Sequence, residues 1–280
     1  MQEVQDSRLI IFSDLDGTLL DHDTYEWQPA RPALDALRRL DIPVVLVSSK
    51  TLAELQDYRE QLHLQHPVVA ENGATIDVPT GYFPNPFAAS DGVPGRAELQ
   101  SIYENVRRDG AFRCEAFYEL GVAGIVRETG LSEQQAQRAN ERNASEPILW
   151  LDTDDRLAEF ERAMRAKDLR CIRGGRFLHL MGNTGKEQAV RRLLNAYARK
   201  YSGATLTSVS LGDAPNDLGM LSSTDIAVII AGKHDHPMTM TAGNRVLRPA
   251  LSGPAGWNQA ILALLDEQPG VSAAAIRNGD

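Results

Sequence analysis

Three short apolar runs, the first two of them followed by segments of helical periodicity, constrain the fold of this chain more than any other feature. The apolar runs lie at residues 9–12, 43–47 and 68–70, and apolar residues recur at helical spacing within 33–40 and 52–62. Strands that alternate with helices in this way pair in parallel, with helices on both faces of the sheet. We therefore predict an α/β fold built on a doubly wound, Rossmann-like parallel sheet.

A polar segment follows each of the three apolar runs. These segments are Asp14–Thr18, Ser48–Lys50 and Glu71–Gly73. In open parallel sheets, ligands bind beyond the carboxyl ends of the strands. The sequence therefore predicts a functional site at this edge of the sheet.

The strand and helix pattern is interrupted in the middle of the chain. Residues 79–95 are rich in Pro and Gly, which is typical of a linker, and a strand-like run with a polar end returns at 206–211. The intervening segment contains amphipathic helices and short apolar runs. We predict a discontinuous core domain, residues 1–84 and 178–280, and an inserted α+β cap, residues 85–177, that sets substrate specificity.

Charge and hydropathy exclude several classes of partner. The 280 residues carry a net charge of −9 and a pI of about 5.2, whereas nucleic acid is held by clustered Lys and Arg. The apolar runs are strand-sized, so we expect no membrane span. Residues 1–8 lack the apolar region of a signal peptide, and we expect a cytoplasmic protein. A small phosphorylated molecule remains compatible with an acidic chain if a metal ion and lysines lie in the pocket.

Asp14 and Asp16, two residues apart at a predicted strand end, fit the chemistry of phosphate ester hydrolysis. This reaction needs a nucleophile, neutralisation of the phosphoryl oxygens and a proton for the leaving alkoxide. The Asp14 carboxylate can attack phosphorus while it shares Mg²⁺, and Asp16 can transfer the proton. Gly17 lets the loop turn sharply. The alternative is a loop in which aspartates only cap a turn.

These residues lie in a longer pattern of four motifs. Asp14-Leu15-Asp16-Gly17-Thr18, Ser48, Lys186 and Gly212-Asp213-Ala214-Pro215-Asn216-Asp217 resemble the motifs of the haloacid dehalogenase-like phosphatase superfamily, in the same order. The resemblance covers essentially the whole chain. A large insertion after the third strand implies the subclass of sugar-phosphate-type phosphatases with an α/β cap.

The resemblance implies a catalytic role for each residue that matches a motif. Asp14 matches the nucleophile, which forms a covalent aspartyl-phosphate, and Asp16 matches the general acid and base. Ser48 matches the hydroxyl that bonds the phosphoryl group, although Ser49 is an alternative. Lys186 matches the cation that holds the phosphoryl group. A lysine is unfavourable in the first turn of a helix, which favours a functional reason for its presence.

The resemblance also implies a Mg²⁺ site. Its ligands are the carboxylates of Asp14 and Asp213 and the backbone carbonyl of Asp16. Asn216 and Asp217 match supporting residues that position the lysine or metal-bound water. Oxygen ligands that leave room for water and substrate suit a hard cation such as Mg²⁺.

Further sequence segments narrow the resemblance to one group of phosphatases within the superfamily. Residues 48–51, 71–74, 129–132, 139–142, 145–149 and 175–179 look like those of mannosyl-3-phosphoglycerate phosphatases and their bacterial relatives. This implies removal of the phosphate from the glycerate 3-position to release mannosylglycerate, a compatible solute. Glucosyl-3-phosphoglycerate and other small sugar phosphates are alternatives with the same chemistry.

Six polar residues are candidates for binding such a substrate. An arginine can bind a carboxylate through two parallel hydrogen bonds, and amide, hydroxyl and carboxylate groups can bind sugar hydroxyls. The candidates are Lys50, Asn72, Arg142, Ser145, Glu146 and Arg176. For Arg142, Glu146 and Arg176 the alternative is ion pairing or packing within the cap.

A non-catalytic class also uses a strand-end aspartate, Mg²⁺, a hydroxyl and a lysine. Receiver-like phospho-sensor modules have these groups. They lack the Asp-x-Asp loop and the inserted cap, and both features are expected here. The sequence therefore favours a phosphatase.

Overall fold

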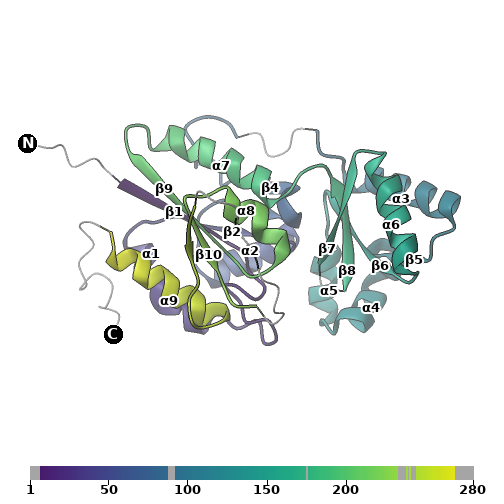
Figure 1. The fold of residues 1–280 in the computed structure, drawn as a ribbon, viewed down its shortest axis with the longest axis horizontal. Coiled ribbons are helices and arrows are strands. Elements are labelled where there is room, and N and C mark those ends of the chain that lie inside the picture. Colours follow the sequence, from purple (N-terminus) through teal and green to yellow (C-terminus); the bar gives the residue numbers. More distant parts are fainter. Residues whose placement is uncertain are drawn as a thin grey trace, which may run out of the picture.

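The computed structural model has two lobes, each built around its own β-sheet (Figure 1). The structure describes residues 7–87, 92–174, 176–232, 238, 240 and 244–268. The larger lobe contains the start of β1 and the end of α9, both at the end of the molecule away from the smaller lobe. Among the described residues, no helix combines the length and the apolar character needed to cross a membrane.

The larger lobe, the core, contains a seven-stranded sheet in the order β11-β10-β9-β1-β2-β3-β4. All neighbouring strands pair in parallel except β3 and β4, which are antiparallel. The strands are β1 (Ser7–Ser13), β2 (Val44–Val47), β3 (Val68–Ala70), β4 (Thr75–Asp77), β9 (Thr205–Gly212), β10 (Ile226–Ile229) and β11 (Arg245–Leu247). The predicted doubly wound α/β fold is confirmed.

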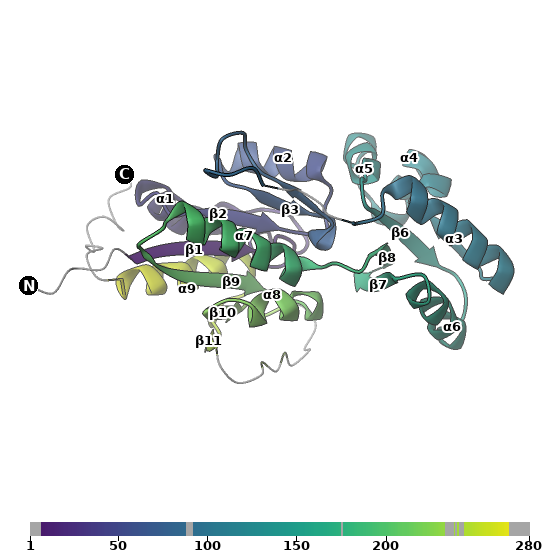
Figure 2. The same cartoon turned by 90° about the horizontal axis from the view of Figure 1, so that it is seen from above.

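Helices cover both faces of the core sheet (Figures 1 and 2). Leu9 and Ile11 of β1 pack on one side, with α1, α2 and α9, whereas Ile10 and Phe12 pack on the other, with α7 and α8. The helices are α1 (Arg31–Arg39), α2 (Leu52–Gln61), α7 (Lys186–Lys200), α8 (Leu218–Ser222) and α9 (Gly253–Asp266). Burial on both faces explains why these strands are continuous apolar runs.

The smaller lobe, the cap, contains a four-stranded antiparallel sheet in the order β5-β6-β8-β7. Its strands are β5 (Cys114–Ala116), β6 (Ser145–Trp150), β7 (Leu169–Gly174) and β8 (Phe177–Gly182), and its helices are α3 (Arg96–Gly110), α4 (Phe117–Thr129), α5 (Glu133–Asn140) and α6 (Asp154–Arg165). Leu178 and Leu180 pack on one face, with α3 and α6. The other face carries Met181, which packs on Ala74 of the core.

Strand β8 corrects the predicted boundary between the lobes. We predicted that the core resumes at residue 178, but β8 pairs with β6 and β7 of the cap along its whole length. The strand is buried on both sides and the next element is α7, a helix of the core. This strand and helix therefore look, in the sequence, like a strand–helix unit of the core. We propose residues 183–185 as the point at which the chain returns to the core.

Candidate active site

The predicted polar segments meet at the carboxyl edge of the core sheet. Asp14 follows β1, the central strand of the sheet, and its backbone N–H donates to Leu211 of β9 at 3.0 Å. Ser48 follows the neighbouring β2, and its N–H donates to Val69 of β3 at 2.9 Å. Asp213 directly follows β9. Three adjacent parallel strands thus place Asp14, Ser48 and Asp213 at one edge.

Lys186 joins two carboxylates at this edge. Its Nζ lies 2.5 Å from Asp14 Oδ1 and 2.6 Å from Asp217 Oδ1. Asp217 is completely buried, and its other oxygen accepts hydrogen bonds from the backbone N–H groups of Asp213 and Ala214 at 3.2 and 3.1 Å. The 212–217 loop therefore fixes Asp217, and Asp217 in turn fixes the lysine beside Asp14.

The charges in this cluster are strongly coupled. Burial raises the pKa of Asp14 well above its usual value, and Lys186 opposes this shift. Burial disfavours the Lys186 ammonium, but Asp14 and Asp217 outweigh this effect and raise its pKa. Burial and the charge of Asp217 raise the pKa of Asp213 to about 6. The site therefore holds more negative charge than its lysine compensates.

The excess negative charge suits a divalent cation. Carboxylate oxygens of Asp14, Asp213 and Asp217 lie within 4.8 Å of one another. With Asp16, four aspartates lie at this edge, and Lys186 and Lys50 form ion pairs with three of them, Asp14, Asp217 and Asp16. Oxygen ligands with net negative charge are those that Mg²⁺ prefers. The residues present therefore fit the predicted metal.

Gly17 is required by the position of Asp213. A Cβ atom at residue 17 would lie 2.4 Å from Asp213 Oδ2, and the backbone of Gly17 has a φ of +82°, which L residues rarely adopt. Thr18 donates its hydroxyl to Asp213 Oδ1 at 3.0 Å. The loop after β1 therefore packs directly on the carboxylate that follows β9, and Thr18 was not predicted from the sequence.

Lys50 contacts Asp16 in this structure. Its Nζ lies 2.9 Å from Asp16 Oδ1, and the ammonium is 5.1 Å from the ring centre of Tyr25 and 5.9 Å from that of Tyr58. Burial disfavours the Lys50 ammonium, but Asp16 and Glu54 outweigh it and raise its pKa. The sequence predicted Lys50 as a substrate contact, whereas the structure places it beside the predicted general acid.

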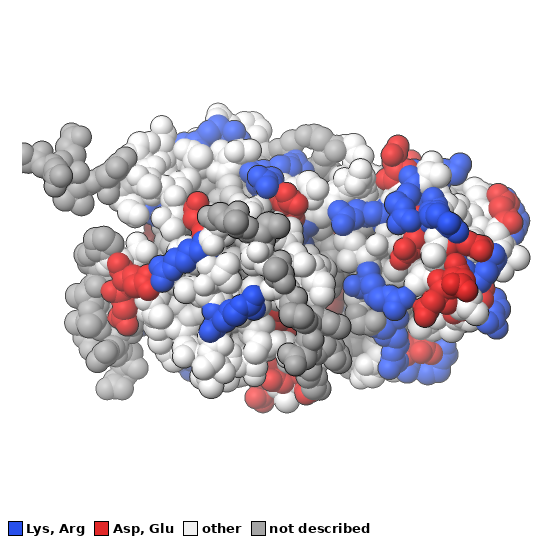
Figure 3. Space-filling model, in the orientation of Figure 1, with Lys and Arg blue, Asp and Glu red and all other residues white. Residues whose placement is uncertain are grey.

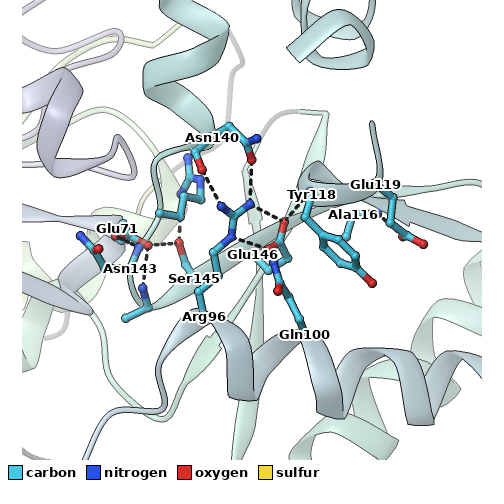
Figure 4. A network of polar contacts seen from close by, with 12 residues as sticks. Glu71, Arg96, Gln100, Ala116, Tyr118, Glu119, Asn140, Asn143, Ser145 and Glu146 are labelled. Carbon is cyan, nitrogen blue, oxygen red and sulfur yellow. Dashed lines mark hydrogen bonds and ion pairs between the residues drawn. The ribbon is translucent and has the colours of Figure 1, made fainter. Parts of the chain in front are cut away.

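Two of the predicted substrate contacts in the cap have partners inside the protein. The fully buried Glu146 accepts from Arg96 Nε at 2.7 Å and from Gln100 at 3.0 Å (Figure 4). Ser145 donates its hydroxyl to Glu71 of the core at 2.6 Å (Figure 4). In this structure both side chains are therefore engaged within the protein rather than with the predicted sugar hydroxyls, because a buried carboxylate requires hydrogen-bond donors.

The two predicted arginines also have partners inside the protein. Arg142 is buried and donates to the Ser49 carbonyl at 3.3 Å and to the Ser145 hydroxyl at 3.0 Å, so it docks the cap on the core. Arg176 is exposed at the turn between β7 and β8, where it contacts Glu128. The predicted Asn72 and Asn216 line a pocket beside Lys186.

Comparison with known proteins identifies the family of this chain. The sequence profile of the haloacid dehalogenase-like hydrolases matches residues 11–87. A protein of Methanococcoides burtonii named glucosyl-3-phosphoglycerate/mannosyl-3-phosphoglycerate phosphatase is 33% identical over 268 residues, which cover 91% of this chain and 97% of that protein. The chain belongs to the haloacid dehalogenase-like hydrolases. It is a phosphatase of this family, and the resemblance predicted from its motifs is confirmed.

Solved structures of other haloacid dehalogenase-like hydrolases share the fold. A phosphatase of the superfamily from Bacteroides thetaiotaomicron aligns with a TM-score of 0.63 at 16% identity, covering 94% of this chain and 97% of that one. The sucrose-phosphatase from Synechocystis, solved with sucrose and phosphate, aligns with a TM-score of 0.61 at 17% identity, covering 92% and 98%. The core and cap therefore occur together in these proteins.

Proposed function

We propose that this phosphatase hydrolyses a small phosphomonoester through a phosphoryl group carried by Asp14, with Mg²⁺ as its cofactor. The observation that carries the proposal is the contact of Lys186 with Asp14 at 2.5 Å beside the carboxylates of Asp213 and Asp217. A phosphoryl group bound at this edge would lie between the nucleophilic carboxylate of Asp14, the ammonium group of Lys186 and the remaining carboxylate oxygens. The proposed metal ligands are Asp14, Asp213 and the Asp16 carbonyl, and the cation would neutralise charge on the phosphoryl oxygens.

In the first step, an Asp14 carboxylate oxygen attacks phosphorus and the bond from phosphorus to the ester oxygen breaks. Lys186 neutralises the phosphoryl oxygens, and Ser48 donates a hydrogen bond to one of them. Asp16 gives its proton to the leaving alkoxide. The contact of Asp16 with Lys50 is made by Oδ1, which leaves Oδ2 to carry the proton for the ester oxygen.

In the second step, Asp16 takes a proton from water as the water oxygen attacks phosphorus. The bond between phosphorus and the Asp14 oxygen breaks, which releases inorganic phosphate and restores the carboxylate. The cap excludes bulk water during transfer to Asp14. The contacts of Glu71 and Arg142 across the two lobes support a closed arrangement of this kind.

We propose mannosyl-3-phosphoglycerate as the substrate, converted to mannosylglycerate, with glucosyl-3-phosphoglycerate as the close alternative. The relative that is 33% identical over nearly its full length is named for both activities. Strings of the cap and of the loop after β3 resemble this group of phosphatases, and Asn72 of that loop lines the pocket beside Lys186.

Phosphate release from purified protein tests the proposal. We expect turnover of mannosyl- or glucosyl-3-phosphoglycerate that requires Mg²⁺, with slower release from hexose phosphates that lack the glycerate. Equal rates of phosphate release with Mg²⁺ and with excess EDTA would contradict the proposal that Mg²⁺ is the cofactor. Faster turnover of a hexose phosphate would contradict the proposed substrate, but not the phosphoryl transfer to Asp14.

A further inference from the structure

A pocket of about 160 Å³ lies between the cap and the core, directly beside Lys186. Asn72 and Asn216 line it from core loops, and Arg170 and Ile172 line it from β7 of the cap. A phosphoryl group held by the lysine places the remainder of the ester in the adjoining space. The pocket is therefore positioned to receive the leaving group.

The register of the cap sheet shows which side chains share this face. Arg170 of β7 pairs with Met181 of β8, and Ile172 pairs with His179. Directly opposed residues of an antiparallel pair lie on the same face of a sheet. Met181 packs on Ala74 of the core, so the face that carries Arg170 and His179 is turned toward the core.

Arg170 brings an unneutralised charge to the pocket. Its Nη1 donates to the Thr184 carbonyl at 3.0 Å, and among the described residues no carboxylate forms an ion pair with it. Glu187 also lines the pocket but is paired with Arg191 at 3.0 Å. A guanidinium has five N–H donors in a planar fork, so Arg170 retains donors for a ligand. Other Lys and Arg side chains lie along the edge of the cap that borders the core (Figure 3), which favours anions.

One buried polar atom of a residue that lines the pocket has no hydrogen-bond partner in the structure. Asn72 is 2% exposed, and its Oδ1 is unpaired. A buried polar atom without a partner is unfavourable, and a ligand that supplies the partner gains affinity.

We propose that this pocket binds the leaving group and that Arg170 binds a carboxylate on it, while Asn72 binds one of its hydroxyl groups. The inference rests on the proposed function and adds the residue that recognises the carboxylate of the substrate. It also moves the carboxylate contact away from Arg142 and Arg176, which are engaged with other parts of the protein.

The test compares two esters that differ in one group. One is mannosyl-3-phosphoglycerate, and the other is the same molecule with its carboxylate converted to a neutral amide. The variants are Arg170→Gln and the control Arg173→Gln, which removes an exposed charge from the same strand. Hydrolysis of p-nitrophenyl phosphate, which has no carboxylate, reports the chemical step alone.

We expect the wild type and Arg173→Gln to prefer the carboxylate by roughly 10- to 100-fold in kcat/KM. Arg170→Gln should lose that preference, because its kcat/KM falls more with the carboxylate ester than with the amide or with p-nitrophenyl phosphate. The inference is overturned if Arg170→Gln loses kcat/KM equally with all three esters, or if the wild type shows no preference for the carboxylate ester. Neither result affects the phosphatase activity itself. Failure of the wild type to release phosphate from any ester overturns the proposed function, and the inference with it.

Discussion

Glu71 of the core accepts a hydrogen bond from the Ser145 hydroxyl of the cap at 2.6 Å, and both side chains are buried. The same carboxylate accepts the backbone N–H groups of Asn143 at 2.8 Å and Ala144 at 3.2 Å. Glu71 and the adjacent Asn72 have positive φ values of 52° and 55°. Strain of this kind persists where surrounding contacts hold the backbone in place. The contacts of Glu71 with the cap hold this turn, and they join the cap to the loop that lines the pocket.

Replacement of Glu71 by Gln should weaken the junction between the lobes. The amide has one acceptor oxygen, so its NH₂ group faces backbone donors and leaves at least one of them unpaired. We expect a loss of about 2 kcal/mol in the free energy of unfolding, measured in urea, and a lower kcat/KM. Glu115→Gln, at an exposed position of β5, is the control. Unchanged stability of Glu71→Gln would contradict the role of Glu71 in joining the cap to the core.

Replacement of Gly17 by Ala should abolish activity at a small cost in stability. The new Cβ collides with the Asp213 carboxylate, and we expect kcat to fall at least 100-fold. Gly203→Ala is a matched control, because Gly203 also has a positive φ of +95° but its Cβ position is open. Both variants should lose about 1 kcal/mol in stability. Similar activities for the two variants would show that the collision has no catalytic consequence.

Replacement of Asp213 by Asn should weaken metal binding. The amide lacks the charge that attracts the cation, and we expect the Mg²⁺ concentration for half-maximal activity to rise at least tenfold. Because the pKa of Asp213 is raised to about 6, protons should compete with Mg²⁺ as the pH falls through 6. Asp109→Asn removes an exposed charge and is the control. An unchanged Mg²⁺ requirement in Asp213→Asn would exclude this carboxylate as a ligand.

His66 should make stability depend on pH. Burial lowers its pKa from 6.5 to about 4, and its Nδ1 bonds the Tyr82 hydroxyl at 2.8 Å. Between these pH values the unfolded chain binds more protons than the folded one, so stability is full above pH 6.5 and is lost as pH falls toward 4. We expect a contribution of about 1–2 kcal/mol at pH 5 relative to pH 7.

The measurement is the free energy of unfolding at both pH values for wild type, His66→Asn and His63→Asn. His66→Asn should show a smaller decrease than the wild type. His63 is exposed, and its left-handed backbone tolerates Asn, so this variant should behave as the wild type does. Identical pH dependence in all three proteins would exclude His66 as the origin.

The core and its polar edge could be predicted because local patterns determine them. The strands at residues 9–12, 43–47 and 68–70 are apolar runs buried on both faces, and each ends in a polar turn at the same edge. Helix α2 also begins at a capping box of Thr51 and Glu54, a local pattern of residue types. In such cases the sequence near each element contains the information that positions it.

The contacts within the cap could not be predicted, because they join residues that are far apart in the sequence. The fully buried Glu146 pairs with Arg96, 50 positions earlier in the chain, so its structural role could not be distinguished from substrate binding. Helix α4 was not predicted, because Gly121 has a φ of 59° and interrupts its helical periodicity. Arg170 was not among the predicted residues, because its proposed role depends on the face of the cap sheet that β7 and β8 turn toward the core.

The most direct test of the proposed mechanism is acid quenching of the enzyme during turnover of a substrate with a ³²P-labelled phosphate. We predict Mg²⁺-dependent, acid-stable label on Asp14, absent from Asp14→Asn. With labelled p-nitrophenyl phosphate, whose leaving group needs no proton, label should accumulate in Asp16→Asn because water attack slows by about 10²- to 10⁴-fold. The contradicting result is steady phosphate release by Asp14→Asn at the wild-type rate, or turnover by the wild type with no labelled protein at any time.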